Sequence, residues 1–237
     1  MTDQSQHSPE SALRDFGRQV MDMFADKQRG RRALARVQQV ATPGDPGSVL
    51  QVMDAFARDG NFMMNVGDEK GPLLADCVRQ AGNAPRILEL GCFCGYSAVL
   101  MAGRLQDGGH LWSLEPDLES VAVARAIIAF AGLSDRVTVL PGKACDLIAG
   151  LTGPFDLVFL DHDKDAYQAD MAAIIGAGLL RPGSIVFADN VGPVFRADQY
   201  LNWVRTHPGF TSTYHKSHVE YLTVEDGVEI SVWQGED

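Results

Sequence analysis

The sequence predicts an α/β fold built on a mostly parallel sheet. After residue 85, short apolar runs alternate with amphipathic stretches, which is the pattern of βαβ units. Two of these runs, 155–160 and 185–188, are followed directly by acidic residues, and open α/β sheets bind their ligands at such carboxyl ends of strands. A chain of 237 residues can bury one sizeable core, so we expect a disordered tail at 1–12 and a single domain over 13–237.

Helices are predicted ahead of the sheet. Between residues 13 and 40 apolar side chains recur at helical spacing, which predicts two helices with a break at Gly30. The stretch 42–47 is rich in proline and glycine and predicts a turn. Ser48 is then expected to cap a helix that ends near residue 58. A further helix is predicted over 70–81.

The sheet itself is predicted to have parallel strands followed by an antiparallel hairpin. The parallel strands are expected at 87–90, 110–114, 137–140, 155–160 and 184–188, with helices at 96–105, 118–131, 144–150, 164–177 and 198–206. Residues 209–224 and 228–233 are predicted to pair as a hairpin at one edge of the sheet. Its turn is expected at Glu225, Asp226 and Gly227.

Composition excludes several classes of partner. Lys and Arg number 20 against 31 Asp and Glu, and a net charge of -11 argues against nucleic acid. No stretch is apolar enough to cross a bilayer, and the first ten residues lack the pattern of a signal peptide, so we expect no membrane partner and a cytoplasmic protein. The four cysteines match neither a disulfide framework nor a usual zinc spacing, and free thiols are expected.

A glycine turn follows the first predicted strand. Gly91 and Gly95 bracket a tight turn that leads into a helix, and its free N–H groups suit a carboxylate or phosphate, although a purely structural turn is the alternative. Glu115 ends the second strand, about 20 residues further on, where a carboxylate commonly binds ribose hydroxyls. Glu89 would repel a pyrophosphate but suits an ammonium group. S-adenosylmethionine therefore fits these charges better than NAD.

Oxygen-bearing side chains end two neighbouring predicted strands. Asp161 follows one strand, and Asp189 with Asn190 follows the other, which together supply the hard ligands that Mg²⁺ prefers. Lys164 lies one helical turn beyond Asp161, where it could remove a proton from a metal-bound hydroxyl. Either Asp alone could instead cap the following helix, and Lys164 could form only a surface ion pair.

A series of motifs occurs in order between about Asp26 and Gly235. They are Met64-Asn65-Val66-Gly67-Asp68, Glu89-Leu90-Gly91, Cys94-Gly95-Tyr96-Ser97-Ala98-Val99, Phe130-Ala131-Gly132-Leu133, Val158-Phe159-Leu160-Asp161-His162, Lys164-Asp165, Gly178-Leu179-Leu180, Ala188-Asp189-Asn190-Val191 and Glu220-Tyr221. This series resembles the small-molecule class I methyltransferases, and specifically the catechol O-methyltransferases. The resemblance implies a Rossmann-like class I methyltransferase fold, with a seven-stranded, mostly parallel sheet, an antiparallel C-terminal hairpin, flanking helices and N-terminal helices.

The resemblance also assigns roles to residues of this chain. It implies an S-adenosylmethionine site at Met64, Asn65, Val66, Glu89, Gly91, Tyr96, Ser97, Glu115, Ala144, Cys145 and His162. It implies Mg²⁺ ligands at Asp161, Asp189 and Asn190, with Lys164 and Glu220 as the catalytic residues. The substrate, a small-molecule catechol, is expected to contact Asp161, Lys164, Asn190, Glu220 and Phe62. Glu220 would accept a hydrogen bond from the second hydroxyl.

Some positions depart from the family pattern, so the specificity stays open. Phe62 stands where the family usually has a tryptophan, and Asp163 stands where it has another aromatic residue. An O-methyltransferase acting on caffeoyl esters or other bulky catechols is therefore an alternative. An NAD-linked dehydrogenase and a cofactor-binding protein without catalysis are alternatives from other classes. Both a monomer and a homodimer are compatible with the sequence.

Overall fold

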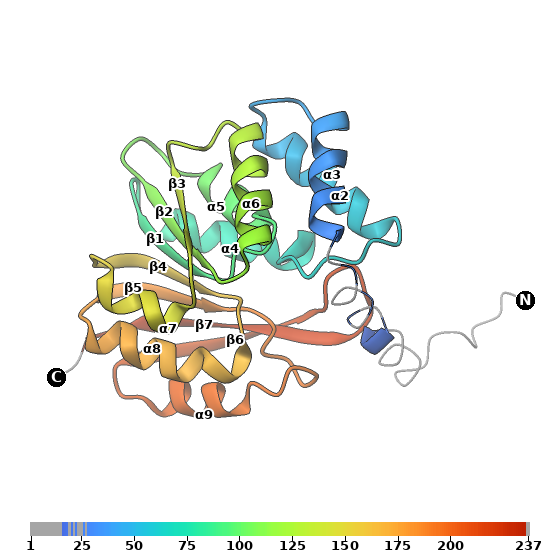
Figure 1. Cartoon of the computed structure of the whole chain (residues 1–237). Helices are drawn as coiled ribbons and strands as arrows, with labels where there is room; N and C mark the ends of the chain where they lie inside the picture. The colour runs from blue at the N-terminus through green and yellow to red at the C-terminus, as the bar shows by residue number, and fades with distance from the viewer. Residues whose placement is uncertain (1–15, 19, 21, 23–25, 27, 236–237) are drawn as a thin grey trace, which may run out of the picture.

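A computed structural model describes residues 16–18, 20, 22, 26 and 28–235, so the tail expected at 1–12 lies outside the described residues. The described chain forms one seven-stranded sheet in the order β3-β2-β1-β4-β5-β7-β6 (Figure 1). The strands are β1 Arg86–Leu90, β2 His110–Glu115, β3 Val137–Pro141, β4 Phe155–Leu160, β5 Leu180–Ala188, β6 Phe210–His218 and β7 Glu225–Trp233. Strands β1 to β5 are parallel, and β7 pairs antiparallel with both β5 and β6. The α/β fold predicted from the sequence is thereby confirmed.

Helices cover both faces of the sheet (Figure 1). One layer consists of α2 Arg29–Val40, α3 Pro46–Arg58, α4 Gly67–Gln80, α5 Tyr96–Ala102 and α6 Leu118–Phe130. The other consists of α7 Ala144–Leu147, α8 Tyr167–Gly176 and α9 Asp198–Thr206, with the short 3-10 helices η1 Ile148–Gly150 and η2 Lys164–Ala166. The crossover helices therefore bury the sheet on both sides, as a parallel sheet requires.

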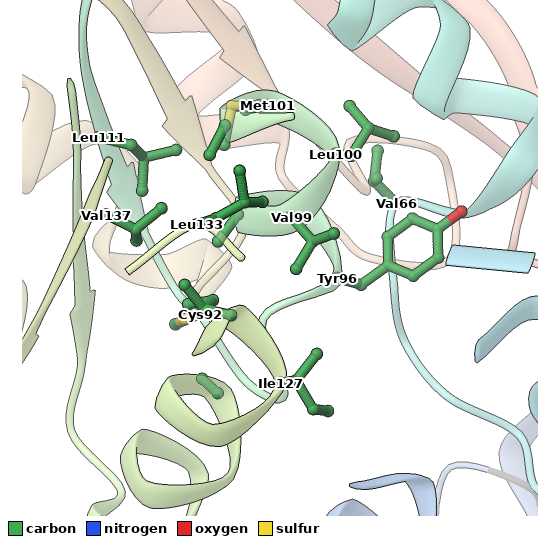
Figure 2. Close-up of a cluster of buried hydrophobic side chains, with 14 of the residues drawn as sticks. Val66, Cys92, Tyr96, Val99, Leu100, Met101, Leu111, Ile127, Leu133 and Val137 are labelled. Atoms are coloured by element: carbon green, nitrogen blue, oxygen red, sulfur yellow. The ribbon is translucent and has the colours of Figure 1, made fainter. Parts of the chain in front are cut away.

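Alternate residues of the central strands feed two separate cores. In β4, Leu157 and Phe159 pack with the α2–α6 layer, whereas Val158 and Leu160 pack with the α7–α9 layer. This is the period of two expected for a strand that is buried on both faces. Figure 2 shows part of the first core, where side chains of α5 and α6 meet the sheet.

Two expectations for the N-terminal helices were wrong. Gly30 does not break a helix, because α2 begins at Arg29 and Gly30 lies in its first turn. Asp45, not Ser48, caps α3, since the Asp45 side chain accepts a hydrogen bond from the backbone N–H of Ser48. The hydroxyl of Ser48 instead accepts from the backbone N–H of Thr42 and closes the preceding turn. Pro46 was expected in the turn but occupies the first helical position, where its missing N–H and fixed φ are tolerated.

The hairpin turn also lies elsewhere than predicted. Glu225 and Asp226 belong to β7, and the connection is made by residues 219–224, where the N–H of Val219 donates to the carbonyl of Val224. The sequence Glu-Asp-Gly suggested a turn because these residues are poor strand formers. In the structure, tertiary contacts favour these residues in the strand. A side chain at Gly227 would overlap the ring of Tyr214, and Asp226 pairs with Lys70.

No helix in the described part of the chain is long and apolar enough to cross a membrane.

Candidate active site

The turn between β1 and α5 lies directly against the carboxyl end of β4. Gly91 has φ +95°, and a Cβ atom there would stand 2.4 Å from the backbone oxygen of Asp161. Gly95, with φ +84°, is the N-cap of α5. Only glycine tolerates both the left-handed backbone and the close approach at position 91. The turn thus brings the start of α5 next to the acidic end of β4.

Glu115 holds this turn in place from the end of β2. Its Oε2 atom accepts hydrogen bonds from the backbone N–H groups of Cys92 at 3.1 Å and Phe93 at 2.8 Å. Its Oε1 atom accepts from the N–H of Asp117 at 2.9 Å. These bonds satisfy donors that the tight turn leaves unpaired. The ribose contact expected for Glu115 remains a prediction, which its position on a cavity wall supports.

Two adjoining cavities open at the carboxyl ends of β1, β2 and β4. One has a volume of about 210 Å³ and the other of about 580 Å³, and Met64, Phe93 and Asp161 belong to both linings. The predicted cofactor residues found in these linings are Met64, Asn65, Gly91, Tyr96, Ser97, Glu115 and His162. Together the cavities give a ligand the size of S-adenosylmethionine room beside the glycine turn.

Four predicted cofactor residues are not part of these cavity walls. Val66 and Glu89 are fully buried behind them. Ala144 is buried at the start of α7, and Cys145 beside it is exposed. Their assignment as cofactor contacts therefore rests on the resemblance alone.

His162 lines both cavities and is fixed by a partner behind it. Its Nε2 atom is 2.8 Å from Oδ2 of Asp170, a buried residue of α8. Its Nδ1 atom is buried and has no partner among the described residues. A buried, unpaired ring nitrogen costs free energy, so a bound water or ligand atom is expected to pair with it.

Glu89 is buried completely beneath the glycine turn. Ser97 of α5 and Ser113 of β2 both donate their hydroxyl protons to its carboxylate. Burial raises the pKa of Glu89 from 4.5 to about 7, and the two serine hydrogen bonds partly oppose that effect. Ser97 lies between this carboxyl group and the smaller cavity.

This burial predicts a pH-dependent effect of Glu89→Gln on the stability of the cofactor-free protein. Because the folded-state pKa is raised, the folded protein holds a proton that the unfolded chain loses, and the wild type loses stability as pH rises from about 4.5 to about 7. Glutamine does not titrate, so the unfolding free energy of the variant should rise relative to that of the wild type by about 3 kcal/mol across this pH range. Urea unfolding at pH 5 and pH 8 measures the difference.

The matched control is Glu225→Gln, because the side chain of Glu225 is exposed. Its unfolding free energy should follow that of the wild type at both pH values. The prediction would be contradicted if the difference in unfolding free energy between Glu89→Gln and the wild type were the same at pH 5 and at pH 8.

The predicted metal ligands meet where β4 and β5 end. Asp189 is 0% exposed, and its Oδ1 atom accepts from the N–H of Asn190 at 2.7 Å. Its Oδ2 atom is buried and has no partner among the described residues. Asn190 has φ +52°, a left-handed conformation that asparagine adopts more readily than most residues other than glycine. Burial raises the pKa of Asp161 to about 7, and Lys164 partly opposes this rise.

Lys164 reaches this site from η2. Its Nζ atom donates to Oδ1 of Asp161 at 3.2 Å and to the hydroxyl of Tyr167 at 2.9 Å. The Tyr167 hydroxyl in turn donates to the backbone oxygens of Leu160 at 2.8 Å and Asp189 at 3.1 Å. Tyr167 therefore ties the amine to the ends of both acidic strands, as expected for a base positioned beside a metal site.

Glu220 enters the same site from the loop between β6 and β7. It is buried, its Oε1 atom contacts the ammonium group of Lys70, and its Oε2 atom has no partner among the described residues. Burial raises the pKa of Glu220 to about 8, and the charge of Lys70 partly opposes this. The structure thus brings together the metal and catalytic residues predicted from the sequence, although their roles stay predictions.

Lys70 and Asp226 are buried in this site and were not among the predicted site residues. Both side chains are 0% exposed, and the Lys70 ammonium stands among Asp189, Glu220 and Asp226. Burial by itself lowers the pKa of Lys70, but these three carboxylates raise it well above its usual value. Lys70 therefore stays charged. The hint in the sequence is that Lys70 lies on the same side of α4 as the buried residues Leu74 and Cys77.

Aromatic side chains form an apolar wall beside Lys164 and Glu220. Phe62, Val219 and Val224 are buried there. Phe16 stands edge-on to Phe62, with 6.4 Å between ring centroids, and belongs to a segment outside the family resemblance. The same cluster includes Phe195, whose ring centre lies 5.9 Å from Nζ of Lys164. Such a wall suits a flat aromatic substrate.

The strand order, the glycine turn and the cavity at the strand ends define a class I methyltransferase. The family model of the O-methyltransferases matches residues 45–203. The chain is 42% identical to catechol O-methyltransferase B of Danio rerio and 41% identical to catechol O-methyltransferase of Mus musculus, each over 91% of this chain and 83% of the relative. The chain belongs to the O-methyltransferase family.

A solved structure agrees with this assignment. The O-methyltransferase TomG from Streptomyces achromogenes, in complex with S-adenosylmethionine, superposes with a TM-score of 0.67 at 25% identity, over 78% of this chain and 90% of that one. Family membership makes this chain a methyltransferase that uses S-adenosylmethionine.

Proposed function

We propose that the chain transfers a methyl group from S-adenosylmethionine to one hydroxyl of a catechol or related vicinal diphenol, with Mg²⁺ as a second cofactor. The observation that carries the proposal is the pair of buried, unpartnered oxygens, Oδ2 of Asp189 and Oε2 of Glu220. They lie in the same site as Lys164, which Tyr167 ties to the end of β5. Similarity to the zebrafish and mouse catechol O-methyltransferases supports the same substrate class.

The residues present fit a magnesium ion. Asp161, Asp189 and Asn190 offer two carboxylates and an amide oxygen, which are hard ligands of the kind that Mg²⁺ selects. The unpaired Oδ2 atom of Asp189 costs free energy unless a ligand satisfies it. When bound, Mg²⁺ would supply positive charge that lowers the pKa of a coordinated catechol hydroxyl.

The remaining steps fall to side chains of this chain. Lys164 would act as the general base that removes a proton from the reacting hydroxyl. Oε2 of Glu220 would accept a hydrogen bond from the neighbouring hydroxyl, which fixes the orientation of the ring. The wall that contains Phe62 would exclude water from one side of the substrate. Holding two reactants in line can contribute about 7–11 kcal/mol, so orientation is a large part of the proposed catalysis.

The cofactor would lie in the two cavities beside the glycine turn. Glu115 lines the smaller cavity, where it would bind the ribose hydroxyls, while its remaining hydrogen bonds hold the turn. Ser97 separates the buried Glu89 from this cavity, so the negative charge of Glu89 would act on an ammonium group through Ser97. S-adenosylmethionine supplies the reactive methyl group on its sulfonium.

The proposal predicts which substrates accept labelled methyl groups from S-adenosylmethionine. The panel contains catechols, a caffeoyl ester and the matching monophenols, each assayed with Mg²⁺ and with EDTA. Transfer is expected only to vicinal diphenols and only with Mg²⁺, because both hydroxyls must be held by the site.

Each other outcome has a defined meaning. Transfer to monophenols, or transfer in EDTA at the same rate, would contradict the proposal. Transfer mainly to the caffeoyl ester would indicate that the enzyme acts on bulkier catechols. No transfer to any acceptor, with S-adenosylmethionine still bound in calorimetry, would support the alternative of a cofactor-binding protein without catalysis.

A further inference from the structure

Lys70 and Asp226 form a buried ion pair behind the proposed metal and substrate sites. Lys70 is in α4 and Asp226 is in β7, so residues far apart in the chain meet here. Nζ of Lys70 is 2.9 Å from Oδ2 of Asp226 and 2.6 Å from Oδ1 of Asp189, and it also contacts Oε1 of Glu220. Oδ2 of Asp226 accepts a second hydrogen bond from Nδ2 of Asn190 at 2.9 Å.

Each of these contacts uses one polar atom of a side chain and leaves the other atom for a ligand. Lys70 and the backbone N–H of Asn190 both hold Oδ1 of Asp189, and the unpartnered atom is Oδ2. Lys70 also holds Oε1 of Glu220, and the unpartnered atom is Oε2. The NH₂ group of Asn190 donates to Oδ2 of Asp226 at 2.9 Å and to Oε1 of Glu220 at 3.4 Å, and because the amide is planar the Oδ1 atom faces the other way.

We propose that Lys70 and Asp226 are positioning residues of this active site. They select which oxygen of each neighbouring side chain faces the metal ion and the substrate hydroxyl, and they touch neither themselves. The inference rests on the proposed function, because it assigns the unpartnered oxygens to those two ligands.

The physical reason is that the carboxylate and amide groups can rotate when nothing holds one of their atoms. Partners behind metal ligands fix their orientation, and removing such a partner typically costs about 10–100-fold in metal affinity or activity. The Lys70 ammonium also compensates part of the charge of three buried carboxylates, which would otherwise repel one another in a site that excludes water.

Asp226→Asn is the sharper of two test variants because it keeps the shape of the side chain. Oδ1 of Asp226 accepts from the N–H of Gly192 at 2.9 Å, and Oδ2 accepts from Lys70 and Asn190. An asparagine would turn its NH₂ group toward a donor in either orientation. Lys70→Met removes the ammonium itself and is expected to lower the melting temperature.

The experiment measures the dissociation constant of Mg²⁺ by calorimetry on the folded, full-length protein, together with kcat and KM for a catechol. Asp226→Asn is expected to weaken Mg²⁺ binding about 10–100-fold and to raise KM for the catechol. Lys70→Met should do the same below its melting temperature. Binding of S-adenosylmethionine without metal should be unchanged in both variants.

Asp156→Asn is the matched control, because Asp156 is another buried carboxylate with an ion pair to Arg181. It lies near the start of β4, at the end of the strand remote from Asp161. A purely structural role predicts that all three variants lose thermal stability while their Mg²⁺ affinity stays at the wild-type value, and this result would overturn the inference.

The wild-type measurement separates this inference from the proposed function. If the wild type neither binds Mg²⁺ nor shows metal-dependent transfer, both are overturned. If the wild type does both, and Asp226→Asn and Lys70→Met bind Mg²⁺ as it does, only the positioning role is overturned.

Discussion

Lys164→Met is expected to lower kcat for a catechol by about 10²–10⁴-fold, which is the usual contribution of a general base. The affinity for S-adenosylmethionine, measured by calorimetry, should stay nearly unchanged. The reason lies in the contacts of the amine, which bonds to Asp161 and Tyr167 on the metal side of the site. The Lys164 side chain is partly buried, at 16% exposed, and methionine has a similar length without a charge, so the variant should stay folded.

Two comparisons separate proton removal from simple charge. Lys164→Arg keeps the positive charge, but a guanidinium cannot give up its proton near neutral pH. The kcat of this variant should therefore be as low as that of Lys164→Met. A catechol made acidic by a nitro group needs less help from a base, and its loss of rate should be smaller. Lys216→Met removes an exposed lysine that pairs with Glu225 and should retain wild-type turnover. Activity preserved in Lys164→Arg would contradict the role as base.

The sheet and the acidic strand ends could be predicted because their signals are local in sequence. An apolar run such as 155–160 is a strand buried on both faces, and the acid that follows it must lie at the carboxyl edge. The placement of Asp161 and Asp189 beside one another then follows from two adjacent parallel strands, which pair here as β4 and β5. Sequence order and strand period were enough for that inference.

Local sequence patterns do not predict three residues of the site, which are Glu220, Lys70 and Asp226. Lys70 and Asp226 are separated by 156 positions, and no local pattern indicates that they meet. Asp226 is of a residue type that disfavours strands, which predicts a turn, whereas its buried ion pair with Lys70 explains its place in β7. Glu220 was found through the family resemblance alone. Lys70 and Asp226 therefore belong to the site because of a long-range ion pair, which no local sequence pattern indicates.

The N-terminal segment gives a second example. Phe16 and Val20 pack on the cluster that contains Phe62, although the family resemblance begins only near Asp26. Their periodicity predicted a helix but gave no information on which part of the sheet it would cover. The contact between this segment and the wall is therefore a feature that only the structure reveals.

Asp189→Asn is expected to abolish Mg²⁺ binding at millimolar concentrations, and with it the metal-dependent part of the methyl transfer. The variant keeps the shape of the side chain but loses the charge that the unpaired Oδ2 atom would offer to the proposed ion. Residual transfer should equal that of the wild type in EDTA. Calorimetric titration of Mg²⁺ and the rate with and without EDTA measure the two effects.

The protein should nevertheless stay folded, because Lys70 keeps Glu220 and Asp226 as partners when Asp189 loses its charge. Leaving a buried charge with no partner at all typically costs about 3–5 kcal/mol, and this variant avoids that situation. A cooperative thermal transition is therefore expected. If the transition disappears, the main role of Asp189 is to stabilise the fold through its ion pair with Lys70. If the transition and the Mg²⁺ affinity both stay at wild-type values, Asp189 is not a metal ligand.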